Sequence, residues 1–131
     1  MKALLLVVLC LAAADAAAQK HAFATCEHFQ AQAMINAVER VEESLALGAD
    51  LECRNPVFSD STALMQAAGG GAVDAVRLLL KRGAKVNARD KGGWTALRHA
   101  RQRYDSFVKA GLPTLKHELV MELLKQAGGT E

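Results

Sequence analysis

Residues 62–94 read TALMQAAGGGAVDAVRLLLKRGAKVNARDKGGW, and Thr95 then begins the same TAL triplet again. The two triplets lie 33 residues apart. A period of about 20–50 residues is typical of repeat proteins, in which each unit is too small to bury its own apolar side chains. The sequence therefore predicts a stack of similar units.

The composition of the chain favours helices. Of its 131 residues, 51% are hydrophobic but only 5% are aromatic, which suits closely spaced helices better than a β-sandwich. The length allows one compact unit and makes a large buried cavity unexpected. A net charge of +2 gives the whole molecule no attraction to nucleic acid, so any charge signal must be local.

Residues 1–18 have the pattern of a cleaved secretory signal peptide. Lys2 supplies a positive start, residues 3–14 are apolar, and three alanines end at Ala18. We place the cleavage before Gln19, which makes the mature protein periplasmic or secreted. The apolar run is shorter than the roughly 20 residues that a bilayer demands, so we expect no stable membrane anchor.

The cysteines divide between the leader and the mature chain. Cys10 leaves with the signal peptide, and acylation of it is disfavoured because the bulky Leu9 precedes it. Cys26 and Cys53 then reach an oxidising compartment, where a disulfide would close a loop of about 27 residues. Such a bridge would stabilise the fold by about 3 kcal/mol. The alternative is two buried or free thiols, and the sequence leaves both open.

The middle unit predicts two antiparallel helices. Thr62 is a natural N-cap for a helix that runs to about Ala68 and ends in the glycines of residues 69–71. A second helix follows and ends at Gly83. Its inward stripe consists of Val73, Val76, Leu79 and Leu80. We expect truncation of Leu80 to alanine to cost about 2–5 kcal/mol.

A worn copy of the unit precedes the middle one. Residues 47–51 repeat residues 82–86 at an offset of 35 rather than 33, so the loop between the units carries two extra residues. Residues 26–47 are expected to be helical, with a break near Asn36, a residue that tolerates a left-handed conformation. Val38, Val41 and Leu45 share one helical face, which we expect to be buried.

A third, longer unit begins at Asp90. Its first helix is prolonged from Arg101 to Gly111, and the segment that ends at Pro113 interrupts the helical pattern. The last helix is expected at residues 114–126. In that helix the predicted inward residues are Leu115, Leu119, Leu123 and Leu124. This unit has the form of a cap.

The repeated residues resemble the ankyrin-repeat family. Its pattern is a finger hairpin with Asp and Gly, then T-P-L-H-x-A-A, a glycine turn, a V-x-x-L-L stripe and G-A-x-x-N. The matching residues are Thr62, Leu64, Ala67, Ala68, Gly71, Val76, Leu79, Leu80, Gly83, Ala84, Asn87, Asp90, Gly93, Thr95, Leu97 and Ala100. The resemblance implies an all-α helical solenoid of about three helix-turn-helix units with short finger loops. An N-terminal extension at 19–26 would precede repeats at about 27–54, 55–89 and 90–127, within a domain of residues 27–131.

This sequence departs from the family pattern at two positions of the first helices. Ala63 and Ala96 replace the proline, and Met65 and Arg98 replace the histidine. His99 is one residue away from the family position, so we expect that it does not restore the family's hydrogen bonds. Stacks of this kind usually need at least three units, and this chain has only about three. We therefore expect marginal stability unless a disulfide or a partner contributes.

No pattern for catalysis or metal binding stands out. The glycines at 69–71 lack the lysine and serine of a phosphate loop. The four histidines show no i, i+4 pairing and no C-x-x-C companion. Cys26 and His28 would point to different sides of a helix. We therefore expect no enzyme activity and no cofactor.

The resemblance implies protein binding through the finger tips and the exposed side of each first helix. The predicted partner-binding residues are Arg54, Val57, Phe58, Arg89, Lys91, Trp94, Arg98, Gln102 and Arg103. Val57 and Phe58 lie in the enlarged loop and suggest an exposed contact site, although Phe58 could instead pack on the first unit. Trp94 beside arginines resembles a binding hot spot, but it could instead stiffen the stack.

Two further features, the glycine pair at 69–70 and the basic residues of the prolonged helix, each allow two interpretations. Gly69 and Gly70 either admit a partner close to the backbone or simply end a helix. The basic residues of the prolonged helix either steer an acidic partner or form a solvated face.

The expected function is that of a protein-interaction module. Small exported bacterial ankyrin proteins resemble dedicated partners of one enzyme, so we expect an inhibitor or immunity protein in the periplasm of a Gram-negative bacterium. Its partner would be an exported enzyme with an acidic cleft. The alternatives are an accessory helper and a structural adaptor, which would use the prolonged terminal helix as a second surface. We expect a monomer until the partner binds, with no nucleic acid and no small-molecule substrate.

Overall fold

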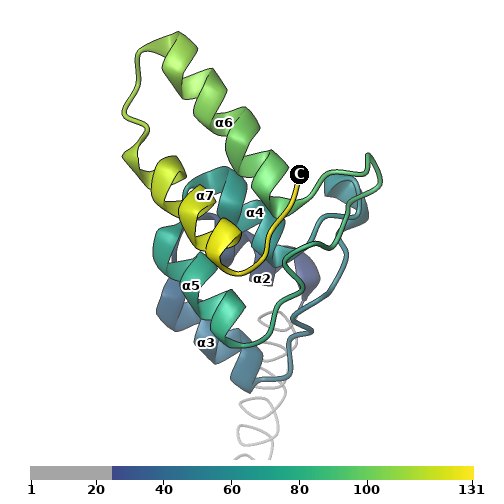
Figure 1. Cartoon of the computed structure of the whole chain (residues 1–131). Helices are drawn as coiled ribbons and strands as arrows, with labels where there is room; N and C mark the ends of the chain where they lie inside the picture. Colours follow the sequence, from purple (N-terminus) through teal and green to yellow (C-terminus); the bar gives the residue numbers. More distant parts are fainter. Residues whose placement is uncertain (1–24) are drawn as a thin grey trace, which may run out of the picture.

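The computed structural model describes residues 25–131. The predicted signal peptide, its cleavage site and nearly all of the N-terminal extension lie outside the described residues. The described part contains six α-helices and a short 3-10 helix (Figure 1). Their bounds are α2 Cys26–Met34, α3 Val38–Ala46, η1 Pro56–Phe58, α4 Ala63–Gly70, α5 Val73–Lys81, α6 Ala96–Ala110 and α7 Leu115–Gln126.

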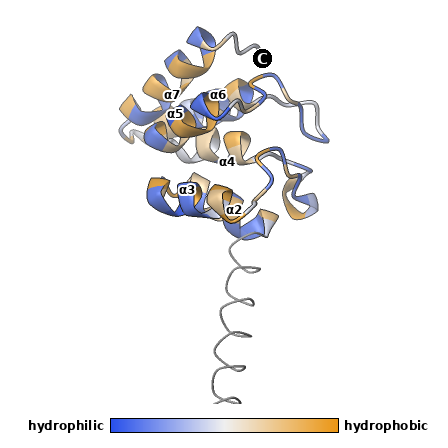
Figure 2. Cartoon of the chain, turned by 90° about the horizontal axis from the view of Figure 1, so that it is seen from below, coloured by the Kyte–Doolittle hydropathy of each residue, from blue (hydrophilic) through white to orange (hydrophobic). Residues whose placement is uncertain are grey.

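The helices form three antiparallel pairs that stack in chain order. In one layer of the stack α2 contacts α4 and α4 contacts α6, and in the other layer α3 contacts α5 and α5 contacts α7. Figure 2 shows the pair α2–α3 at one end, α4–α5 in the middle and α6–α7 at the far end. The predicted all-α helical solenoid is therefore confirmed.

Local sequence signals determine where the helices begin and turn. The Thr62 hydroxyl accepts a hydrogen bond from the Met65 amide at 3.4 Å, as expected for an N-cap. Asn36, in the turn between α2 and α3, has a φ of +61°. Its side-chain oxygen also accepts from the Ala75 amide at 2.9 Å, so this residue joins the first turn to the start of α5.

The core runs through all three pairs. The side chains of Phe29, Val41, Val76, Leu79 and Leu124 are fully buried. Leu80 is only partly buried and packs at the edge of this core, so the large loss of stability predicted for its truncation belongs to Leu79 instead. Val38 and Leu45 likewise lie at the edge, beside the buried Val41.

Two of the leucines predicted to point inward on α7 do not. Leu115 is 64% exposed and Leu119 is 41% exposed, whereas the buried residues of α7 are His117, Val120, Met121 and Leu124. The reason is the rotation of α7 about its axis. The ring of His117 packs 4.7 Å from that of Phe107, and its Nε2 lies 3.2 Å from the Gly69 carbonyl oxygen. These contacts place His117 inward, and positions 115 and 119 then fall to one side.

The glycines after Ala68 have a reason that the sequence did not reveal. Gly69 and Gly70 belong to α4, and only Gly71, with a φ of +67°, ends the helix. A Cβ on Gly70 would overlap the carbonyl oxygen of Met34 at the end of α2. Gly70 is therefore required by the close packing of α2 against α4, not by a helix-ending turn.

The C-terminal tail closes the last unit. The Asn87 side chain donates to the Gly128 carbonyl at 3.0 Å and accepts from the Thr130 amide at 2.8 Å. The Thr95 hydroxyl donates to the Thr130 carbonyl at 2.5 Å, and Arg101 pairs with the Glu131 carboxylate at 3.4 Å. The tail thus lies against Asn87 and against the first part of α6.

Candidate partner-binding face

The first finger, residues 54–61, is a tight loop whose tip carries apolar side chains. Asn55 and Ser61 form an antiparallel bridge at its base, and the Asn55 side chain accepts from the Val57 amide at 3.0 Å. At the tip, Val57 is 75% exposed and Phe58 is 53% exposed. Phe58 therefore does not pack away against the first unit, and an apolar tip is presented to solvent.

The base of the first finger is fastened to α2. A disulfide joins Cys26 to Cys53. The buried side chain of Gln30 also donates to the Cys53 carbonyl at 3.1 Å and to the Ser61 carbonyl at 2.7 Å. Both ends of the finger are therefore held by the same helix, which limits the shapes that the tip can adopt.

The second finger, residues 89–94, is organised by one carboxylate. Asp90 Oδ1 accepts from the amides of Gly92 and Trp94, each at 2.9 Å, and its Oδ2 lies 2.7 Å from His99 Nε2. Partial burial alone would raise the pKa of Asp90. The hydrogen bonds from the Trp94 amide, the His99 ring and the Gly92 amide, together with the charge of His99, outweigh it and lower that pKa below its usual value.

Two predicted binding arginines also hold the fingers together. Arg54 donates to the Asp60 carbonyl at 3.0 Å and to the Arg89 carbonyl at 2.6 Å. Arg89 donates to the Gly93 carbonyl at 2.7 Å and to the Glu131 carbonyl at 3.3 Å. The structure gives both guanidinium groups an internal role, while their predicted role in partner binding stays a prediction.

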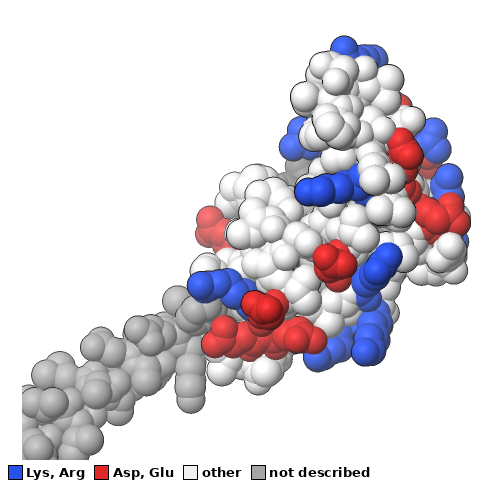
Figure 3. Space-filling model, turned by 90° about the vertical axis from the view of Figure 1, so that its left-hand side faces the viewer, with Lys and Arg blue, Asp and Glu red and all other residues white. Residues whose placement is uncertain are grey.

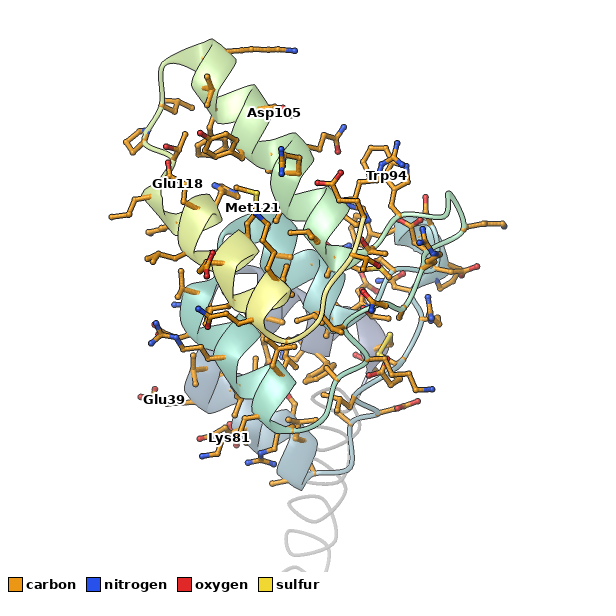
Figure 4. The ribbon with its side chains drawn as sticks, in the orientation of Figure 1. Glu39, Lys81, Trp94, Asp105, Glu118 and Met121 are labelled. Atoms are coloured by element: carbon orange, nitrogen blue, oxygen red, sulfur yellow. A yellow bond between two sulfur atoms is a disulfide. The ribbon has the colours of Figure 1, made fainter. Side chains whose placement is uncertain are left out.

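Trp94 forms the centre of a small aromatic and cationic cluster. The Arg98 guanidinium carbon lies 4.7 Å from the centroid of the Trp94 ring, and the His99 ring lies 5.3 Å from it. Trp94 is half-buried and sits beside the first turn of α6 (Figure 4). Such stacking holds the indole in one orientation. The structure is therefore compatible with both interpretations of Trp94, as a residue that stiffens this unit and as a rigid edge for partner binding.

The two fingers lie side by side and enclose a hollow. The Lys91 amide donates to the Ser59 carbonyl at 2.8 Å, which links the fingers directly. The hollow has a volume of about 370 Å³ and is lined by Ser59, Asp90, Gly92, Trp94 and His99.

A second, smaller hollow of about 120 Å³ crosses the layer of first helices. It is lined by Met34, Met65, Gln66, Gly69, Gly70, His99, Gln102 and Arg103. His99 lines both hollows, which makes them neighbours on either side of its ring. We call the two hollows, together with the two finger tips, the finger face.

The finger face brings together most of the predicted site. It gathers the tip of the first finger, Trp94 and Arg98, and the exposed Gln102 and Arg103. Gln30 was not foreseen from the sequence, and the role of His99 was underestimated. Gln30 is one of two buried glutamines of α2, and no local pattern marks it as the one that holds the finger. The spacing of nine residues between Asp90 and His99 likewise carries no recognisable signal for the role of His99.

The repeat pattern, the stacked helix pairs and the finger loops agree with comparison to known sequences. Residues 28–110, well over half of the chain, match the family described as ankyrin repeats in three copies. The chain belongs to the ankyrin-repeat family. Ankyrin repeats are protein-interaction modules, so this protein is one as well.

Similar stretches occur in much longer ankyrin-repeat proteins. The chain is 53% identical over 45 residues to human M-phase phosphoprotein 8, which covers 34% of this chain and 5% of that protein. It is 50% identical over 55 residues to the rat mitochondrial disaggregase, which covers 40% of this chain and 8% of that protein. It is 41% identical over 61 residues to the rat Arf-GAP with coiled-coil, ANK repeat and PH domain-containing protein 2. This match covers 47% of this chain and 8% of that protein. The chain therefore spans less than a tenth of these relatives.

Two further observations concern residues 25–131 alone. No group of three His, Cys, Asp or Glu side chains in this part could hold a metal ion. No helix in this part is both long and apolar enough to span a bilayer. The absence of enzyme activity stays an expectation from the sequence.

Proposed function

We propose that this ankyrin-repeat protein is exported and uses the finger face to bind one enzyme partner, which it inhibits or neutralises. The observation that carries the proposal is the junction of the two fingers. An exposed apolar tip, a half-buried tryptophan and a hollow of about 370 Å³ occur there together. Interfaces obtain most of their binding energy from such aromatic and arginine anchors.

The charges around the finger face favour an acidic partner. Lys91, Arg98 and Arg103 are exposed beside the hollows, while the carboxylate of Asp90 is turned inward to three internal donors. Basic side chains at an interface steer an acidic surface into contact and raise the association rate. An enzyme with an acidic cleft would be blocked by insertion of the Phe58 tip or the Trp94 edge.

The disulfide supports export. Structural disulfides persist in oxidising compartments and are rare in the cytosol of mesophiles. Because Cys26 and Cys53 fasten the finger that carries Phe58, oxidation would also pre-organise the proposed contact surface. Cell fractionation and N-terminal sequencing of the mature protein test export. A mature chain starting at Gln19 in the periplasm is expected, and a cytosolic chain starting at Met1 would contradict it.

Partner capture tests the surface. The processed protein is immobilised and exposed to periplasmic extract, and bound enzymes are identified and assayed for inhibition. Trp94→Ala and Phe58→Ala should each weaken capture by about 10-fold or more. The control is Lys81→Ala, an exposed residue at the end of α5 that lies far from Trp94 and outside the α6–α7 hairpin (Figure 4). Undiminished capture by both finger-face variants would reject the proposed surface, and capture that increases enzyme activity would favour an accessory helper.

A further inference from the structure

The prolonged part of the third unit carries an apolar patch of five residues, which is larger than the exposed pair Met34 and Ile35 in the turn of the first unit. Helix α6 has 15 residues, whereas α2 and α4 have 9 and 8. Figure 1 shows the end of α6 and the following loop projecting at one end of the molecule, away from the finger loops. The exposed apolar residues there are Val108, Leu112, Pro113, Leu115 and Leu119, which we call the tip patch.

The apolar side chains of the tip patch are both largely exposed and close together. Val108 is 53% exposed and Leu112 is 49% exposed, in addition to the leucines of α7 described above. Beside them a hollow of about 430 Å³ is lined by Phe107, Pro113, Leu115 and Lys116. Clustered exposed apolar side chains mark contact sites. Figure 3 shows the projecting end as largely free of charged groups on that face, with basic side chains at its extremity.

The patch is not simply the unfinished end of the stack. Beyond the prolonged hairpin, toward its C-terminal end, α7 exposes the polar residues Glu122, Lys125 and Gln126, and Glu122 accepts a hydrogen bond from Gln126 at 3.0 Å. Arg101 and Glu131 form an ion pair over the same unit. The terminal unit thus has the polar outer surface of a capping repeat. The apolar residues lie only on the prolonged α6–α7 hairpin, so a fourth repeat does not explain them.

The charges around the tip patch are of both signs and balance. Asp105 lies one turn before Val108 on α6, and Glu118 lies one turn after Leu115 on α7 (Figure 4). Lys109 and Lys116 directly follow those same two apolar residues. Asp105 and Lys109 lie one turn apart on α6, so two copies of α6 packed antiparallel about a two-fold axis set the acid of one copy against the base of the other. A strongly charged partner or membrane surface would meet like charges at this rim.

We propose that the tip patch is a self-association surface, at which a second copy of this chain docks α6–α7 hairpin to hairpin. The contact is isologous, so the leucines of one copy fill the hollow beside Phe107 of its partner and the rim charges pair across the edge. Because the finger face lies elsewhere, the dimer presents two finger faces to a partner. A two-site partner or an enzyme oligomer would then be bound with avidity. This inference is independent of the proposed function and, unlike the expectation of a monomer drawn from the sequence, it predicts a dimer before any partner binds.

Sedimentation of the processed chain, residues 19–131, tests the inference, since the whole described core lies within it. Over a concentration series, the wild type should move from monomer to dimer. Leu115→Asp should weaken self-association by at least about 10-fold, since it removes a buried leucine from the contact. Val57→Asp makes the same change at an exposed aliphatic residue of the first finger and should leave self-association unchanged. Circular dichroism confirms that all variants are folded.

A cross-linking measurement separates a two-fold contact from other modes. In a Leu112→Cys variant, equivalent residues of two copies should be joined by a short bifunctional thiol reagent, and Leu115→Asp added to it should abolish the product. A wild type that stays monomeric at every concentration would overturn the inference. So would a dimer insensitive to Leu115→Asp, or binding of the tip to phosphatidylglycerol vesicles without self-association.

Discussion

The two fingers of this protein have similar positions but are fastened by different chemistry. The first is held at its base by a disulfide and by the buried amide of Gln30, both from α2, the first helix of the preceding unit. The second is held by the Asp90 carboxylate, which binds its own turn and the His99 ring of the helix that follows it. The first finger therefore depends on redox state, and the second depends on the ionisation of one acid.

Loss of the disulfide should produce the largest effect. A Cys26→Ser and Cys53→Ser double variant should lose about 3 kcal/mol of unfolding free energy, because the unfolded chain is no longer cross-linked. Urea unfolding measures the loss, and reduction of the wild type should reproduce it. Hydrogen exchange should increase in the first finger and stay unchanged in the second. If reduction left the urea midpoint in place, the bridge would have no role in fastening the finger.

Replacement of Gln30 should come next. Gln30→Leu keeps a side chain of similar size but removes the donor from the Cys53 and Ser61 carbonyls, at an expected cost of about 2 kcal/mol. Gln66→Leu is the matched control, since Gln66 is only partly buried and donates to the Ser61 hydroxyl at 2.8 Å. The control should lose no more than about 1 kcal/mol. Equal losses in the two variants would show that burial of the Gln30 amide is not what matters.

Acid should loosen the second finger selectively. The folded pKa of Asp90 is lowered, so its contribution to stability is complete above the unfolded value of about 3.9 and is lost as pH falls through the lower folded value. Asp90→Asn should cost about 1 kcal/mol at pH 7, because hydrogen bonds to a charged acceptor are the stronger ones. Thermal melts of the wild type and of Asp90→Asn between pH 7 and 3 should show the difference in their melting temperatures shrinking below about pH 4. A difference that stays constant would contradict the assignment.

Truncation at the tip of the first finger should have the smallest effect on stability. Val57 and Phe58 are mostly exposed, so Val57→Ala and Phe58→Ala should each change the unfolding free energy by no more than about 0.5 kcal/mol. Urea unfolding checks this value. A loss as large as that of Gln30→Leu would mean that Phe58 packs into the first unit in solution and is not a free contact residue.

The sequence predicted those parts of the fold in which one residue type has one local role. The N-cap at Thr62, the turn at Asn36 and the break at Pro113 lie where they were expected, because caps and turns depend on neighbouring residues alone. The exposed tip at Phe58 was also predictable from its polar surroundings.

The errors concern contacts between distant residues. Apolar spacing shows that α7 has a buried stripe, but its rotation is set by His117 against Phe107 and Gly69, and no local pattern encodes that contact. Leu115 and Leu119 were therefore placed inward when they are exposed. The same limit applies to the candidate site. Arg54 and Arg89 look like free binding residues in the sequence, whereas in the fold they donate to carbonyls of the fingers.

The contact of Gly70 with the Met34 carbonyl makes the two junctions of the stack unequal. Between α4 and α6, the position that corresponds to Gly70 is Arg103, which carries a long side chain, so that junction is packed without a glycine against the neighbouring backbone. The units of this protein are consequently not interchangeable parts. An engineer who duplicated the middle unit or exchanged it for the third would preserve the repeat pattern but lose the fit. A longer array built from this scaffold needs a glycine at each junction that copies the first.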